Sequence, residues 1–271
     1  MRQIKFVKMH GLANDFVIID LTKEMHLVDE TFVKSIANRK TGVGCDQVIL
    51  LNKSDKSDIC MTIFNSDGSK AEACGNATRC VAKYICDNKN LKSCTIEFSG
   101  KVSRCKQIAE SFSCTMGKPS MDWSTIPLSK KMNCLELDYN ILGLPKPSAV
   151  NVGNPHVVFF VENIEAISID QLGPKIEYDS LFPKKVNVSF AQILNEDSVL
   201  LRVWERGVGK TESCGTAACA TAYAAIKRNL VRGGRIKILF NHGNLIINLL
   251  KNDELEMIGD ANLVFTGQFF L

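Results

Sequence analysis

The sequence predicts an α+β fold of two similar halves, and three features of the chain support this prediction. First, one short pattern occurs twice, with cysteines that are 214 − 74 = 140 residues apart, as Glu72-Ala73-Cys74-Gly75-Asn76-Ala77 and Glu212-Ser213-Cys214-Gly215-Thr216-Ala217. Second, an apolar, alanine-rich segment of helical composition follows each cysteine. Third, short strand-like runs surround this segment in both halves. We therefore expect two pseudo-symmetric domains, each a curled mixed or antiparallel sheet wrapped around a central helix.

The repeat continues upstream of the cysteines without a gap. At the same offset, Ile63-Phe64-Asn65 aligns with Val203-Trp204-Glu205, and Gln47-Val48 aligns with Asn187-Val188. A duplicated domain is the simplest cause of this alignment. If the two domains are related by a pseudo-twofold axis, each brings one cysteine, at the start of a helix, to a shared cleft.

The order of the predicted elements is also repeated. In the first half we expect helices at 29–38 and 74–86, and strands at 16–19, 47–51, 61–64, 94–98, 103–108 and 111–116. In the second half we expect helices near 167–172 and at 214–228, and strands at 157–161, 186–192 and 200–204. The predicted domains are residues 1–117 and 118–262, with 263–271 returning as a strand to the first domain. The helix after Cys214 has almost no charged face, so we expect it to be buried on all sides.

Composition excludes several classes of protein. The 271 residues are 45% hydrophobic and 23% charged, and the net charge of +4 is not gathered into a basic block, so no nucleic-acid partner is expected. No apolar run approaches the roughly 18 residues of a membrane span. The 11 cysteines are an odd number, and no apolar signal segment precedes them. We therefore expect reduced thiols and a cytoplasmic protein.

The two repeated cysteines predict proton-transfer chemistry. Each precedes glycine at a predicted helix N-terminus, where free N–H groups lower a thiol pKa and bind a carboxylate. If a substrate Cα–H lies between two such thiols, one thiolate removes the proton and the other thiol delivers a proton to the opposite face. Inversion at that carbon is the result. We interpret the other nine cysteines as structural, including Cys80 and Cys219.

Other functions explain fewer of these residues. The segment Gly207-Val208-Gly209-Lys210-Thr211 ends like a phosphate-binding loop, but the first glycine of that loop falls at Trp204. A cysteine hydrolase that uses Cys74 and His156 leaves Cys214 unexplained. A non-enzymatic binding protein does not require both cysteines. The sequence contains no CxxC pair, so a structural zinc site is not expected, and it contains no motif that suggests a cofactor.

Several longer motifs together resemble the diaminopimelate epimerase family, nearly from end to end of the chain. These motifs are Met9-His10-Gly11-Leu12-Ala13-Asn14-Asp15-Phe16, Phe64-Asn65-Ser66-Asp67-Gly68-Ser69, Cys74-Gly75-Asn76, Gly153-Asn154-Pro155-His156, Leu181-Phe182-Pro183, Trp204-Glu205-Arg206-Gly207 and Cys214-Gly215-Thr216. The resemblance implies a cofactor-independent isomerase that interconverts LL- and meso-diaminopimelate for lysine and peptidoglycan synthesis. It also implies two α/β domains, each a sheet around a central helix, with the active site between them.

The resemblance also assigns roles to residues. It implies that Cys74 and Cys214 are the catalytic acid and base, and that His156 and Glu205 assist their ionisation. It implies that the non-reacting end of the substrate is held by Asn65, Asn154, Asn187 and Arg206, with Asn14 and Gln47 also lining the pocket. The N–H groups that bind the reacting carboxylate would come from Gly75, Asn76, Gly215 and Thr216.

The chain departs from the family pattern at a few positions. Ala13, Ala77 and Ala217 replace residues that are usually glycine, and His242-Gly243-Asn244 replaces a turn that is commonly Pro-Gly-Gly-like. A racemase of another amino acid on the same fold, of histidine, lanthionine or proline type, therefore stays open. Arg206 and the asparagines favour a diaminopimelate-like substrate, because a substrate without a second amino-acid end would leave them unpaired. A small amino acid is the expected partner, and a homodimer is an assembly that the sequence leaves open.

Overall fold

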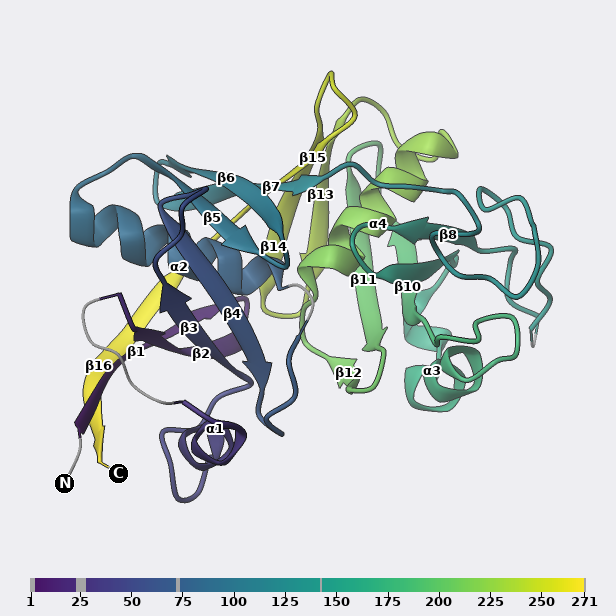
Figure 1. Cartoon of the computed structure of the whole chain (residues 1–271). Coiled ribbons are helices and arrows are strands. Elements are labelled where there is room, and N and C mark those ends of the chain that lie inside the picture. Colours follow the sequence, from purple (N-terminus) through teal and green to yellow (C-terminus); the bar gives the residue numbers. More distant parts are fainter. Residues whose placement is uncertain (1–2, 23–27, 72–73, 142, 271) are drawn as a thin grey trace. The chain divides into compact units, whose positions relative to one another are not determined.

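The computed structural model describes residues 3–22, 28–71, 74–141 and 143–270 (Figure 1). The chain divides into two compact units, unit 1 being Met1–Thr115 with Gly259–Leu271, and unit 2 being Met116–Ile258. The sequence placed these boundaries after residues 117 and 262. Glu72 and Ala73 of the first cysteine motif lie outside the described residues.

The described part of unit 1 forms a curved sheet with two helices. Its strands pair in the order β16-β1-β2-β3-β4-β5-β6-β7. Along the chain the elements are β1 (Gln3–Gly11), β2 (Asn14–Asp20), α1 (Glu30–Ala37), β3 (Gln47–Asn52), β4 (Ile59–Asn65), α2 (Gly75–Lys89), β5 (Ser93–Phe98), β6 (Lys101–Ile108), β7 (Ser111–Gly117) and β16 (Asn262–Phe270). As predicted, the segment near the end of the sequence returns as a strand, and β16 pairs antiparallel with β1.

Unit 2 repeats this arrangement. Its strands pair in the order β8-β9-β10-β11-β13-β14-β15, with the short β12 beside β11. Its elements are β8 (Ser148–Asn151), β9 (Pro155–Phe160), the 3₁₀ helix η1 (Ile164–Ala166), α3 (Ile169–Glu177), β10 (Asn187–Ile193), β11 (Ser198–Glu205), β12 (Gly209–Thr211), α4 (Gly215–Lys227), β13 (Arg235–Phe240), β14 (Gly243–Leu249) and β15 (Leu255–Gly259). The strands β8, β12, β13, β14 and β15 are additions to the second-half strands that the sequence predicted.

The repeat of 140 residues extends to the pairing of single residues. Phe16 pairs with Gln47 between β2 and β3, and His156 pairs with Asn187 between β9 and β10, where 156 − 16 and 187 − 47 are both 140. Both pairs of strands are parallel, as are β4–β5 and β11–β13, and a helix lies in each of these four connections. The sequence duplication is therefore a duplication of the fold.

Local signals explain where the helices begin and end. Asp29 caps α1, since its side chain accepts a hydrogen bond from the Phe32 N–H. The cysteines Cys74 and Cys214 are the N-cap residues of α2 and α4. The helix α3 begins after Ser168 and continues past residue 172, where the prediction ended, with Pro174 inside it.

The central helix of each unit is buried by the strands around it. The helix α2 packs against β1, β2, β5 and β6, and α4 packs against β8, β9, β10, β11, β13 and β14 (Figure 1). As predicted, α4 is buried along nearly its whole length. Its alanines allow the strands to approach closely. Among the described helices, none is both long enough and apolar enough to cross a membrane.

Candidate functional site

The predicted site residues lie at equivalent places in the two units. In each unit they occupy the beginnings of two parallel strands, the end of the next strand and the N-terminus of the central helix. The pairs related by 140 residues are Asn14 and Asn154, Gln47 and Asn187, Asn65 and Glu205, Cys74 and Cys214, Gly75 and Gly215, and Asn76 and Thr216. The fold thus assembles two polar half-sites, each around one cysteine.

In unit 1, the half-buried Cys74 lies among amide groups. Its sulfur accepts a hydrogen bond from the Ala77 N–H at 3.5 Å and donates one to Asn14 Oδ1 at 3.6 Å. The same Asn14 oxygen accepts a hydrogen bond from Asn76 Nδ2 at 3.3 Å. The structure therefore joins two of the predicted site residues, Cys74 and Asn76, through a third, Asn14.

Gln47 and Asn65 form a second contact in this half-site. Gln47 Nε2 donates a hydrogen bond to Asn65 Oδ1 at 3.0 Å. Gln47 Oε1 is buried and has no hydrogen-bond partner within the described part of the chain. Because a buried polar atom without a partner is costly, this oxygen is suited to accept a hydrogen bond from a ligand.

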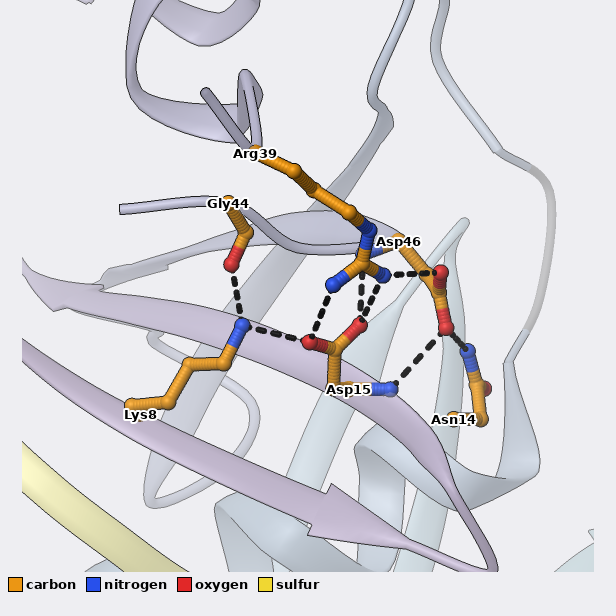
Figure 2. Close-up of polar contacts among 6 residues, drawn as sticks. All are labelled: Lys8, Asn14, Asp15, Arg39, Gly44 and Asp46. Carbon is orange, nitrogen blue, oxygen red and sulfur yellow. Dashed lines mark hydrogen bonds and ion pairs between the residues drawn. The ribbon is translucent and has the colours of Figure 1, made fainter. Parts of the chain in front are cut away.

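A cluster of charged side chains contacts Asn14 on the side formed by Asp46 (Figure 2). Asn14 Nδ2 donates to Asp46 Oδ2 at 3.0 Å, and Arg39 donates to both Asp46 and Asp15 at 2.7 Å. The nearly buried Lys8 donates to Asp15 at 2.5 Å and to the Gly44 carbonyl. Partial burial opposes the ionisation of Asp15, but the hydrogen bonds from Arg39 and Lys8 outweigh it and hold the pKa well below its usual range.

In unit 2, the buried Cys214 contacts a carboxylate. Its thiol donates a hydrogen bond to Glu205 Oε2 at 3.1 Å and lies 3.4 Å from the Thr216 hydroxyl. Thr211 Oγ1 donates to the other Glu205 oxygen at 2.6 Å. Burial, with the negative charge of Glu205, raises the pKa of Cys214 well above its ordinary value. The prediction of a lowered pKa is wrong for Cys214, because desolvation outweighs the helix N-terminus.

The ring of His156 is fully buried beside Asn154. Its Nε2 lies 2.9 Å from Asn154 Oδ1, while Nδ1 has no hydrogen-bond partner among the described residues. Burial, with the nearby Arg206 guanidinium, lowers the pKa of His156 to about 3. The imidazole is therefore neutral at physiological pH, with one nitrogen available to a ligand.

Two buried side chains hold the segment that carries Glu205 and Arg206. Asn187 accepts a hydrogen bond from the Arg206 N–H at 3.0 Å and donates to the Pro155 carbonyl at 2.8 Å. Glu177 of α3 accepts hydrogen bonds from Trp204 Nε1 at 2.7 Å and from the Gly207 N–H at 2.9 Å. In this structure Asn187 positions the backbone of its own half-site.

Comparison with known proteins identifies the family. The family model described as "Diaminopimelate epimerase" matches residues 6–121 and 148–264. The chain belongs to the diaminopimelate epimerase family. A diaminopimelate epimerase of Sphingopyxis alaskensis is 45% identical over 264 residues, covering 97% of this chain and 96% of that protein. One from Erythrobacter litoralis is 44% identical over 268 residues, covering 98% of this chain and 97% of that protein.

Solved structures of distant proteins share the fold. A probable proline racemase from Agrobacterium radiobacter has a TM-score of 0.73 at 14% identity, covering 99% of this chain and 93% of that chain. A Bacillus anthracis protein of the PhzF family has a TM-score of 0.69 at 16% identity, covering both chains fully. These similarities show the two-domain α+β fold of the diaminopimelate epimerase family.

Several residues of the two half-sites were not singled out from the sequence. The most prominent are Lys8, Asp15, Arg39, Asp46, Arg79 and Glu177. Asp15 follows Asn14 and Asp46 precedes Gln47 in the sequence, so their position next to predicted site residues could have identified these two aspartates. Glu177 had no such signal. Within the described residues, no group of three histidine, cysteine, aspartate or glutamate side chains is arranged to hold a metal ion.

Proposed function

We propose that this member of the diaminopimelate epimerase family interconverts LL- and meso-diaminopimelate, with Cys74 and Cys214 as the two bases and without a cofactor. Membership of the family supports the reaction. The observation that supports the mechanism is that both cysteines cap their central helices at positions related by 140 residues. A thiol at the same N-cap position in both units fits a reaction in which protons are removed from and delivered to opposite faces of one carbon.

The reaction requires one thiolate and one thiol. The thiolate takes the proton from the substrate α-carbon, and the electron pair left on that carbon takes the proton of the other thiol. Because burial and Glu205 keep Cys214 protonated, Cys214 is the proton donor of the resting protein. In the reverse direction, Glu205 is placed at 3.1 Å to accept the Cys214 proton.

The helix N-termini stabilise the developing charge. The N–H groups at the start of a helix bind anions, and the first residues of the two central helices are Gly75 and Asn76 in α2 and Gly215 and Thr216 in α4. These groups hold the carboxylate next to the reacting carbon, so that the carbanion-like transition state is stabilised.

Polar side chains then select the substrate. We assign the far end of the substrate to Asn65, Asn154, Asn187 and Arg206, with Asn14 and Gln47 lining the pocket. His156 assists as a neutral imidazole, in line with its lowered pKa. The odd cysteine count makes the cytoplasm the proposed location.

Single stereoisomers of amino acids incubated with the protein in deuterated water test this function. LL-diaminopimelate is expected to give meso product with deuterium at the inverted carbon, as read by chiral chromatography and mass spectrometry. The panel includes histidine, lanthionine and proline. Preferred turnover of one of these assigns the chain to another racemase, and unlabelled product excludes solvent-exchanging thiols as the bases.

A further inference from the structure

A directed chain of hydrogen bonds crosses the Cys74 half-site. Arg79 Nη2 donates to Asn76 Oδ1 at 3.0 Å, and Asn76 Nδ2 donates to Asn14 Oδ1 at 3.3 Å. Asn14 Nδ2 then donates to Asp46 Oδ2 at 3.0 Å (Figure 2). Two amides are thus linked in series between a guanidinium and a carboxylate.

The two ends of this chain fix its direction. A guanidinium can only donate hydrogen bonds, and an ionised carboxylate can only accept them. Turning either amide would place two donors or two acceptors against each other, at Arg79 or at Asp46. The orientation of Asn14 is therefore set from both sides, and its carbonyl oxygen faces the Cys74 sulfur at 3.6 Å.

Both ends are themselves held in place. Arg79 is fully buried and also donates to the Asp260 and Gly75 carbonyls. Arg39 and the Asp15 N–H both donate to Asp46. The equivalent positions in unit 2 are Cys219 for Arg79 and Val186 for Asp46. Because neither residue supplies a guanidinium or a carboxylate, the described part of unit 2 has no equivalent of this hydrogen-bond chain.

We propose that Arg79 and Asp46 are positioning residues for Cys74, and that they act by keeping the Asn14 carbonyl oxygen directed at its sulfur. A carbonyl favours the protonated thiol, which can donate to it, over the thiolate, which it repels. The thiolate that forms when Cys74 delivers its proton to the substrate carbon is therefore a stronger base, for the return of that proton, than a thiolate facing an Asn14 N–H. This inference rests on the proposed function only in assigning a proton transfer to Cys74.

The test measures Cys74 in the ligand-free protein, where substrate identity has no influence. Alkylation by iodoacetamide is followed against pH, and peptide mass spectrometry separates Cys74 from the other ten of the 11 cysteines. In Asp46→Asn, the new amide can donate to Asn14, so that only the Arg79 end still fixes the orientation of Asn14. Alkylation of Cys74 near pH 7 should then rise about 3- to 10-fold, the effect of one hydrogen bond of about 1 kcal/mol, and its midpoint should move to lower pH.

A matched control separates orientation from charge. Asp15→Asn removes the same charge one residue from Asn14 but leaves the Asn14–Asp46 hydrogen bond in place. A smaller acceleration than in Asp46→Asn supports the proposal, whereas equal accelerations, or none in Asp46→Asn, overturn it. The other charged and titratable groups described around this half-site are kept; they include Lys8 and His10 on β1, Arg39 and Cys45 before β3, Arg79 and Cys80 on α2, and Asp260 after β15.

A measurement on the unaltered protein covers the case in which the variants do not fold. The side-chain amide protons of Asn14 and Asn76 each donate in the chain, so their NMR signals should exchange slowly with solvent. Exchange of both at the rate of exposed asparagine overturns the inference. A wild type that is inactive on diaminopimelate but shows slow exchange would contradict the proposed substrate and leave the positioning role intact.

Discussion

The two units share a backbone but surround their cysteines with different chemistry. Phe16 and Asn65 of unit 1 stand where unit 2 has His156 and Glu205. Cys74 contacts the amide of Asn14, whereas Cys214 contacts the carboxylate of Glu205. The equivalents of the unit 1 ions Asp15 and Asp46 are Pro155 and Val186.

This difference separates the role of the shared backbone from the role of the side chains around each cysteine. The N-cap position places the sulfur at the start of the helix in both units, so the shared backbone determines location. The neighbouring side chains determine how readily each sulfur holds its proton. A reaction that needs one thiol and one thiolate at the same time requires that kind of inequality.

Removal of each cysteine is the strongest way to break the comparison. Cys74→Ala and Cys214→Ala should each lower epimerisation roughly 10²- to 10⁴-fold, the range for loss of a general acid or base. Each variant should still exchange the α-proton of only one isomer, LL or meso, with deuterated water. Exchange of the same isomer by both variants would contradict a division of faces between the thiols.

Substitution of Glu205, the acidic neighbour of Cys214, sharpens the comparison. Glu205 raises the pKa of Cys214, so Glu205→Gln should lower that pKa and accelerate Cys214 alkylation at neutral pH. Turnover should fall roughly 10- to 100-fold, because Glu205 is the group proposed to take the Cys214 proton. The reciprocal Asn65→Glu should slow alkylation of Cys74. An unchanged Cys214 pH profile in Glu205→Gln would exclude the carboxylate as its regulator.

The charged cluster of unit 1 predicts a pH-dependent contribution of Asp15 to stability. Asp15→Asn should lower the free energy of unfolding at pH 7 by about 2 to 4 kcal/mol, since Lys8 loses its buried partner. The pKa of Asp15 is depressed on folding, so this stabilisation is present above the unfolded value of about 3.9 and is lost as pH falls below it. Urea titrations from pH 7 to pH 3 should show the difference shrink. Glu165→Gln, which removes the exposed Arg202–Glu165 pair of unit 2, is the control and should change little.

The smallest expected effect concerns packing under β11. A Cβ atom on Gly173 would lie 2.5 Å from the Trp204 ring, whereas unit 1 fills these positions with Val33 and Phe64. Gly173→Ala should destabilise the protein by about 1 to 3 kcal/mol through overpacking. In a urea-unfolding cycle, Gly173→Ala with Trp204→Phe should cost less than the sum of the single changes. Strict additivity would show that the two residues do not compete for space.

The repeat made much of this fold predictable from the sequence. Offset and periodicity located the central helices, the returning strand and the cysteine N-caps, because these depend on local composition and on a pattern present twice. The β13, β14 and β15 strands were not predicted, although Arg235–Phe240 alternates buried and exposed residues as a half-covered strand does.

The electrostatics of the half-sites were less predictable. A helix N-terminus is a local feature and suggested an acidic Cys214, but its raised pKa depends on burial by segments distant in sequence. The contacts of Asp15 with Lys8 and Arg39 likewise join residues up to 39 − 15 = 24 positions apart. Side-chain pairing of this kind follows from tertiary structure and not from spacing.

The pairing of β1 with β16 has a consequence for synthesis. Unit 2 is one continuous stretch, Met116–Ile258, whereas unit 1 obtains an outer strand only from residues that follow that stretch. As the chain leaves the ribosome, unit 2 can be completed while β1 still lacks this neighbour. Closing the Gln3 to Phe270 contact also joins very distant positions, which is slow in folding. The unit translated first is therefore the one finished last.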